Sequence, residues 1–281
     1  MAFVDFKYLS PVMGMQMNIG VILPEVMQGI GVEGTGKDEN APIPTLYLLH
    51  GTSDDQTIWH RRTSIERYVS DKRLAVVMMT THLGAYTNQK YGFRYFDYVA
   101  KEVPEICARY FNLSRKREEK FIAGLSMGGY GALKIGLALP DEFSVVGGLS
   151  AGVDRLGHLP EALRTMKSIE EFRAMKDELD PRAYANWMNF FLNFGSPAEF
   201  AESKENNLFL LAEEAKASGK TLPKLIIRCG TEDKLAIEPN RRFKKHLDTL
   251  GIENDYAEFP GIHSWEFWDT HIQYVLSQIE L

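Results

Sequence analysis

The sequence predicts an α/β fold, with a mostly parallel sheet and helices on both of its faces. Short, continuous apolar runs recur along the chain, as they do in strands that are buried on both sides. Segments with the apolar spacing of helices separate these runs. The 281 residues are enough for one large α/β domain. We therefore expect a single domain over residues 1–281.

The N-terminal part of the chain predicts the one antiparallel element. Residues 3–9 and 15–23 alternate apolar and polar side chains, and residues 10–14 break the alternation. This pattern predicts an antiparallel strand pair at one edge of the sheet. Glycines and mixed charges predict a loop at residues 28–44.

The remaining elements follow from the apolar runs and the helical periodicity. Apolar runs predict buried strands at residues 45–50, 75–79, 120–123, 144–149 and 225–229, and a last strand at 255–259. Helical periodicity predicts helices at residues 59–70, 98–111, 127–139, about 239–250, and 265–279. Between residues 154 and 221 the chain has helix-like stretches and no clear strand. We expect this segment to be a helical insertion, or cap, between the sixth and seventh strands.

Composition and charge exclude several classes of function. The formal net charge of −6 argues against a nucleic-acid-binding surface and disfavours strongly anionic substrates. Cys107 and Cys229 fall in apolar patterns, and no Cys/His cluster has zinc spacing, so we expect no metal and no other cofactor. The N-terminus lacks the pattern of a signal peptide, and no stretch is apolar enough to span a membrane. These features predict a cytoplasmic protein without a nucleic-acid or membrane partner, and they leave homo-oligomerisation open.

The stretch Gly124-Leu125-Ser126-Met127-Gly128 is the most informative motif of the chain. It follows a predicted buried strand and opens a predicted helix, which is the setting of the G-x-S-x-G nucleophile elbow. The strand and the helix pass so close to one another that a Cβ would not fit two residues before or two residues after the serine. Gly124 and Gly128 meet this need because glycine has no Cβ. The helix N-terminus directs free N–H groups at the point where negative charge develops. The motif predicts an α/β-hydrolase fold with Ser126 as the nucleophile.

A serine nucleophile needs a histidine as base, and this fold places it after the serine in the chain. His263 stands in a loop between the last predicted strand and the last predicted helix, where the base must lie. His246 and His271 fall inside helical patterns, and His158 lies in the insertion. We therefore predict His263 as the base.

The histidine in turn needs a carboxylate to fix its tautomer. Asp233 follows the strand at 225–229 and is the first choice for this role. Glu232 beside it ranks second, because the turn should direct one of the two side chains inward. Asp154, after the preceding strand, ranks third. Capping of a helix is the structural alternative for an aspartate in such a turn.

The oxyanion of the tetrahedral intermediate needs two backbone N–H groups. Met127, directly after the nucleophile, should supply one of them. Thr52, in the loop after the strand at 45–50, should supply the other, and Gly51 lets that loop approach the substrate. His50 is interpreted as a buried, hydrogen-bonded residue.

Several motifs together resemble the esterase D family, and within it the bacterial tributyrin esterases. They include His50-Gly51-Thr52-Ser53-Asp54-Asp55, Tyr95-Phe96-Asp97-Tyr98, the elbow, and Gly261-Ile262-His263-Ser264-Trp265. Relatives in that family include S-formylglutathione hydrolases, acetyl-xylan esterases and feruloyl esterases. The resemblance implies hydrolysis of short acyl esters through an acyl-enzyme, with Ser126, Asp233 and His263 at the matching positions.

The substrate pocket is expected at Gly51, at Trp265 and along the aromatic run 187–194, in particular Trp187 and Phe191. The alternative is that these aromatic residues belong to the core. A capped pocket would select acetyl to butyryl esters, or acetyl- and feruloyl-decorated plant-polysaccharide fragments. A thioesterase of the S-formylglutathione hydrolase type is the nearest alternative function. An acyltransferase and a hydrolase-like protein that binds without catalysis rank lower.

Overall fold

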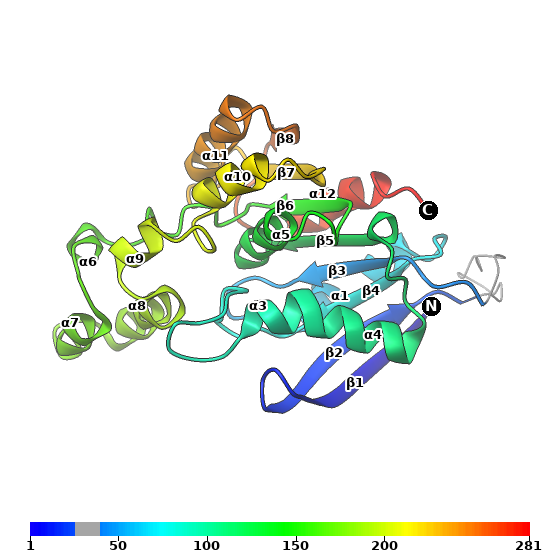
Figure 1. Cartoon of the computed structure of the whole chain (residues 1–281), viewed down its shortest axis with the longest axis horizontal. Helices are drawn as coiled ribbons and strands as arrows, with labels where there is room; N and C mark the ends of the chain where they lie inside the picture. Colours follow the sequence, from blue (N-terminus) through cyan, green and yellow to red (C-terminus); the bar gives the residue numbers. More distant parts are fainter. Residues whose placement is uncertain (26–39) are drawn as a thin grey trace.

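The computed structural model describes residues 1–25 and 40–281, which form one sheet of eight strands (Figure 1). The strands are β1 Ala2–Ser10, β2 Met15–Leu23, β3 Thr45–Leu49, β4 Ala75–Met79, β5 Lys120–Leu125, β6 Val145–Leu149, β7 Lys224–Gly230 and β8 Asn254–Phe259. Their order in the sheet is β1-β2-β4-β3-β5-β6-β7-β8. β2 pairs antiparallel with β1 and with β4, and the other pairings are parallel. The predicted mostly parallel sheet with an N-terminal antiparallel pair is confirmed.

Helices cover both faces of this sheet (Figure 1). Outside the segment 154–221 they are α1 Ile58–Arg62, α2 Ile65–Tyr68, α3 Tyr95–Asp97, α4 Val103–Phe111, α5 Met127–Ala138, α11 Ile237–Thr249 and α12 Trp265–Ser277. Successive side chains of a strand point to opposite faces. Leu49 of β3 therefore packs in the same cluster as Tyr130 of α5, whereas Leu48 packs with Trp59 of α1 and Ile272 of α12. None of the helices in the described residues is long and apolar enough to cross a membrane.

Two predicted helices differ from the structure. The helix predicted at 59–70 is two short helices, α1 and α2, because Thr63 between them is extended and its hydroxyl hydrogen-bonds the carbonyl oxygen of Trp59 at 2.6 Å. The helix predicted at 98–111 starts earlier, at α3, and passes through a π-helical turn, η1 Tyr98–Glu102. Pro104 follows this turn and has no N–H for a regular helical hydrogen bond. Of the loop predicted at 28–44, residues 28–39 lie outside the described residues.

The segment 154–221 is helical where the sequence predicts an insertion. It contains α6 Glu161–Arg164, α7 Ile169–Ala174, α8 Pro181–Phe194, α9 Pro197–Ala201 and α10 Leu208–Ala217. Helices α6 to α9 lie together beyond one end of the sheet, at the left of Figure 1. Helix α10 instead packs against α5 and α11, in the layer that covers the sheet. The part of the segment that extends past the sheet is therefore α6 to α9.

Candidate active site

Ser126 lies at the sharp turn between β5 and α5, as the elbow motif predicts. Its φ of +51° is in the left-handed region, which a non-glycine residue seldom adopts. Three backbone hydrogen bonds hold it there. Its N–H donates to the carbonyl of Leu149 at 2.8 Å, and its carbonyl accepts from the N–H groups of Tyr130 and Gly152, both at 3.0 Å. The backbone around Ser126 is thus fixed before any substrate binds.

The two glycines of the motif are required by the close approach of α5 to the sheet. A Cβ on Gly128 would lie 2.4 Å from the carbonyl oxygen of Leu49 in β3. A Cβ on Gly124 would lie 2.5 Å from the backbone of Gly128. These contacts are with backbone atoms and cannot be relieved by a change of rotamer.

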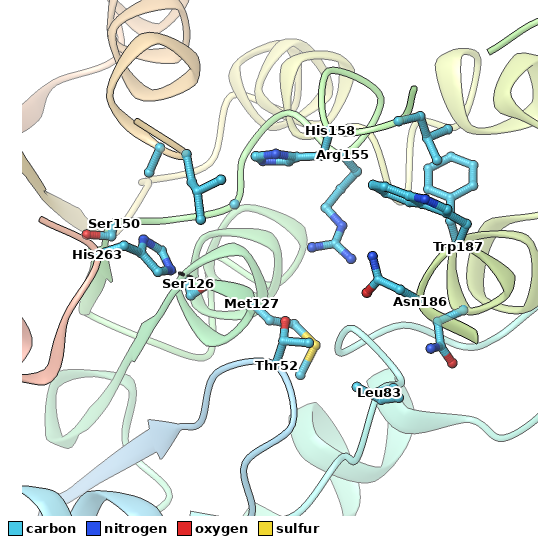
Figure 2. Close-up of a pocket in the computed structure, with 16 residues that line it drawn as sticks. Thr52, Leu83, Ser126, Met127, Ser150, Arg155, His158, Asn186, Trp187 and His263 are labelled. Carbon is cyan, nitrogen blue, oxygen red and sulfur yellow. Dashed lines mark hydrogen bonds between the residues drawn. The ribbon is translucent and has the colours of Figure 1, made fainter. Parts of the chain in front are cut away.

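His263 connects Ser126 to a buried carboxylate. Its Nε2 is 3.0 Å from Ser126 Oγ, and its Nδ1 is 2.7 Å from Asp233 Oδ2 (Figure 2). A carboxylate accepts hydrogen bonds, so Nδ1 carries the ring hydrogen and Nε2 is left to accept the proton of the serine hydroxyl. His263 is thus within hydrogen-bond reach of both Ser126 and Asp233, which is the geometry that can activate a serine as a nucleophile.

Asp233 is held as an anion. Its side chain is 0% exposed, and its Oδ1 accepts from the N–H of Ala236 at 3.0 Å. Burial alone would raise the pKa of the Asp233 carboxyl. The hydrogen bond to His263 and the donor from Ala236 outweigh burial and lower the pKa below its usual value. The carboxylate can therefore stabilise a positive charge on His263.

The two other acidic candidates do not contact His263 in this structure. Glu232 Oε2 accepts from the N–H of Gly261 at 2.6 Å, which joins the turn after β7 to the loop that carries the histidine. This hydrogen bond lowers the pKa of the Glu232 carboxyl. Asp154 forms an ion pair with Arg242 and accepts from the N–H of Gly157. Glu232 thus supports the position of the histidine loop, whereas Asp154 stabilises its own turn.

The three other histidines that follow Ser126 in the chain have other surroundings. His246 on α11 lies 3.0 Å from the carbonyl oxygen of Phe209, and His271 on α12 packs against Phe267 with a centroid distance of 4.1 Å. His158 is different, because it lines the cavity above Ser126 (Figure 2). Burial, followed by the nearby charge of Arg155, lowers the pKa of the His158 imidazole.

The expected oxyanion donors border the same cavity. Thr52 and Met127 both line it (Figure 2). The carbonyl of Gly51 belongs to the same peptide unit as the N–H of Thr52, so the two groups point in opposite directions. His50 Nδ1 is 2.7 Å from that carbonyl oxygen, and its Nε2 accepts from the N–H of Thr81 at 2.9 Å. His50 therefore holds the peptide that carries the Thr52 donor.

The cavity above Ser126 has a volume of about 330 Å³. Its lining combines Ser126 and His263 with Thr52 and with residues of the helical segment 154–221. The lining residues are Thr52, Leu83, Ser126, Met127, Ser150, Gly152, Arg155, His158, Leu159, Asn186, Trp187, Asn189, Phe190, Leu235, Ala236 and His263. Among the described residues, no group of three or more His, Cys, Asp or Glu side chains is placed to hold a metal ion.

Three of the four residues predicted for the pocket do not line this cavity. Trp187 lines it, but Phe191 is buried and stacks on Phe172 of α7 at 4.6 Å, because α7 covers that side of α8. Trp265 packs edge-on against Trp59 at 5.3 Å, on the other face of the sheet. Gly51 is not among the lining residues, although its neighbour Thr52 is. Phe191 therefore belongs to the core, and Trp265 is partly buried against the core cluster that contains Trp59.

Phe190 of the predicted aromatic run lines the cavity although the sequence analysis did not single it out, and Arg155 and Asn186 were not predicted as lining residues. Arg155 had a usable signal, since it lies in the loop after β6, at the same end of the sheet as Ser126 and Asp233. The carboxyl ends of parallel strands meet at one edge, where ligands bind. Asn186 and Phe190 belong to α8, and its periodicity could not say which of its two covered faces meets the cavity.

Comparisons with known proteins show which proteins this chain resembles. The model of a family described as "Putative esterase" matches residues 10–276. An acetyl esterase from Caldicellulosiruptor saccharolyticus is 28% identical over 275 residues, which is 97% of this chain and 96% of that protein. A solved fluorophosphonate-binding serine hydrolase of Staphylococcus aureus is 32% identical, with a TM-score of 0.77 and coverage of 100% of this chain and 99% of that one. An S-formylglutathione hydrolase of the same species is also 32% identical, with a TM-score of 0.76 and coverage of 99% and 98%.

Proposed function

The chain belongs to the esterase family, and from this premise we propose that it hydrolyses short-chain acyl esters through an acyl-enzyme formed on Ser126. The relatives confirm the predicted α/β-hydrolase fold, the resemblance to esterases and the class of carboxylic ester hydrolase. The observation that carries the proposal is the unbroken chain of hydrogen-bond distances from Ser126 through His263 to Asp233.

The proposed reaction has two steps. Ser126 Oγ attacks the ester carbonyl carbon while His263 Nε2 takes the hydroxyl proton, and the N–H groups of Thr52 and Met127 stabilise the oxyanion. The bond to the alcohol then breaks, and His263 returns its proton to the leaving oxygen. Water attacks the acyl-Ser126 ester with the same proton transfers and releases the carboxylic acid. Asp233 keeps His263 in the required tautomer throughout.

The dimensions of the cavity support a small acyl group. A volume of about 330 Å³ is at the lower end of the range for ligand pockets. Trp187 and Phe190 of α8 form its wall on the side of the insertion, which we propose acts as a cap within a single domain over residues 1–281. Acetyl to butyryl esters fit these limits, and the acetyl esterase relative supports the short end of that range.

A thioesterase is the second candidate function. The 32% identical S-formylglutathione hydrolase favours it, because that protein matches nearly the whole chain. The same triad can cleave an ester or a thioester. Comparing kcat/KM for S-formylglutathione with kcat/KM for 4-nitrophenyl acetate and ethyl ferulate would separate the two functions. A clear preference for the thioester would replace the first proposal with the second.

The substitution Ser126→Ala tests the nucleophile. We expect it to reduce hydrolysis of 4-nitrophenyl acetate by about 10⁴-fold or more and to abolish labelling by a fluorophosphonate probe, since both need the hydroxyl. The matched control is Ser277→Ala, at an exposed position at the end of α12. Circular dichroism and the melting temperature of both variants show whether they remain folded. A folded Ser126→Ala enzyme that keeps its activity would refute the proposal.

A further inference from the structure

Arg155 places a positive charge inside the active-site cavity. Its guanidinium points into the open space, on the opposite side of Ser126 from His263 (Figure 2). It also lies close to the nucleophile. The point where a Cβ on Gly152 would sit is 3.5 Å from Arg155 Nη1 and 3.7 Å from the carbonyl oxygen of Ser126. A ligand bound to Ser126 would therefore meet this charge.

The charge of Arg155 is not balanced by the described residues. None of them places a carboxylate within ion-pair distance of its guanidinium, whereas Arg242 nearby pairs with Asp154. The guanidinium instead lies over the rings of Tyr130 and Phe194, with centroid distances of 5.7 and 5.9 Å. Burial lowers the pKa of the Arg155 guanidinium. A partly buried charge without a partner is costly, so its position indicates an anionic ligand.

The surroundings of Arg155 add donors and no competing acid. None of the residues that line the cavity is an aspartate or a glutamate. Asn186 of α8 faces the guanidinium across the cavity, and His158 lies on its other side (Figure 2). Both side chains can donate a hydrogen bond, and a guanidinium binds a carboxylate through two parallel N–H donors. The donors of Arg155, Asn186 and His158 together suit one carboxylate group of a small substrate.

The position of His263 decides which part of the ester carries that carboxylate. His263 gives its proton to the leaving alcohol, so the alcohol must depart on the side of His263. Arg155 is on the opposite side of Ser126 and faces the acyl part. We propose that Arg155 binds a carboxylate on the acyl group, so that this enzyme prefers hemiesters of short dicarboxylic acids. The inference rests on the proposed esterase function and narrows its substrate class. The positive charge that Arg155 places in the cavity is opposite in sign to the net charge of the whole chain, which is −6.

The test compares two substrates of nearly the same shape, methyl hydrogen succinate and its neutral amide, methyl succinamate. Methanol release gives kcat/KM for each substrate with the wild-type enzyme and with Arg155→Met, Arg155→Lys and Arg182→Met. Methionine keeps the packing on Tyr130 and Phe194 without the charge, and lysine keeps a charge. Arg182 is an exposed arginine of α8 that serves as the matched control.

We expect the wild-type enzyme to prefer the acid over the amide. Arg155→Met should reduce the acid-to-amide ratio of kcat/KM on the order of 30-fold, Arg155→Lys should retain part of it, and Arg182→Met should leave it unchanged. An unchanged ratio in Arg155→Met would overturn the inference. So would an equal loss for both substrates together with a lower melting temperature, which would indicate that Arg155 only packs on the two rings.

Two further assays distinguish a failure of this inference from a failure of the proposed function. The wild-type enzyme and each variant are also assayed with 4-nitrophenyl acetate and with a fluorophosphonate probe. If the wild-type enzyme reacts with both and the acid-to-amide ratio does not depend on Arg155, the inference on the acyl carboxylate alone is wrong. If the wild-type enzyme reacts with neither, the proposed function itself fails.

Discussion

His50 acts on the active site without lining its cavity. The ring is 1% exposed and sits between the carbonyl of Gly51 and the N–H of Thr81, so one nitrogen donates and the other accepts. That pattern requires the neutral imidazole. A protonated ring would offer a second donor to the N–H of Thr81 and would lose its acceptor. The peptide that carries the Thr52 N–H therefore depends on the protonation state of His50.

This arrangement predicts a pH-dependent stability. Burial lowers the pKa of His50 from 6.5 to about 4. Between these values the unfolded chain binds a proton at His50 and the folded chain does not, so the free energy of unfolding rises with pH across this window. Acidification from pH 6.5 to 4 should therefore lower the free energy of unfolding by about 3 kcal/mol through His50.

Urea unfolding at pH 4.5 and pH 7 measures the effect. His50→Gln should lower stability at pH 7 and reduce the difference between the two pH values, because glutamine does not titrate. His60→Gln is the control, at a position that is exposed by about a third and lies outside the cavity. An equal pH dependence in wild type and His50→Gln would show that His50 is not the group that titrates.

Among single residues, the sequence could locate the proposed triad because each of its members follows the end of a strand. Ser126 follows β5, Asp233 follows β7 and His263 follows β8, and the parallel pairing of these strands brings their carboxyl ends to one edge. Glu232 and Asp233 are adjacent in sequence, so the choice between them rested on the direction of one turn. That direction is visible in the structure, where Glu232 contacts Gly261 and Asp233 contacts His263.

Helix α5 shows how one element positions the proposed nucleophile, Ser126. It starts at Met127, directly after Ser126, and its first turn passes against the end of β3. The approach to β3 is so close because residue 128 has no side chain, and Gly129 likewise lets the same turn pass close to Ala151. A wider separation would carry Met127, and with it a proposed oxyanion donor, away from the cavity.

Helix α5 therefore should not tolerate a Cβ at residue 128. We expect Gly128→Ala to destabilise the protein by more than 3 kcal/mol and to abolish 4-nitrophenyl acetate hydrolysis, since the methyl group would lie 2.4 Å from the carbonyl oxygen of Leu49. Gly152→Ala is the comparison, because the nearest atom to its Cβ would be at 3.5 Å. Thermal unfolding of both variants decides the point. A Gly128→Ala protein as stable as Gly152→Ala would mean that the helix can move away from β3.

The elements that the sequence predicted well have strong local patterns. The buried strands are continuous apolar runs, and β1 and the first half of β2 alternate, so the core faces there follow directly from the residues. The break between α1 and α2 has no such pattern. It depends on the hydroxyl of Thr63 and on Asp269 of α12, whose carboxylate accepts from the N–H of Ser64 at 3.3 Å, 205 residues away in the chain. A contact at that separation leaves no trace in a local window.

At the scale of the whole molecule, the insertion and the loop after β4 together close one side of the cavity. Trp187 and Phe190 come from α8, and Leu83 comes from the loop. These parts are far apart in the sequence, so their common cavity could not be predicted from periodicity. Their contact is polar. The N–H groups of Lys90 and Tyr91 donate to carbonyls near the end of α8, at 3.1 and 3.0 Å.

Asn193 is the centre of this contact, and its replacement tests how the proposed cap is attached. The residue is 1% exposed, its Nδ2 donates to the carbonyl of Leu83 at 2.9 Å, and its Oδ1 accepts from Gln89 at 2.6 Å. Asn193→Ala leaves the carbonyl of Leu83 and the side-chain amide of Gln89 without their hydrogen-bond partner. This loss should reduce the free energy of unfolding by about 1–3 kcal/mol. The cavity wall should also loosen while Ser126 and His263 keep their positions.

We therefore expect Asn193→Ala to raise KM for 4-nitrophenyl acetate by more than it lowers kcat. Steady-state kinetics and urea unfolding measure the two effects, with Asn18→Ala on the exposed side of β2 as the control. The proposed triad lies on the turns after β5, β7 and β8, whereas the side chain of Asn193 hydrogen-bonds to Leu83 and Gln89. A large loss of kcat at unchanged KM would show that the insertion positions the reacting groups themselves, and the description of α6 to α9 as a cap would then be wrong.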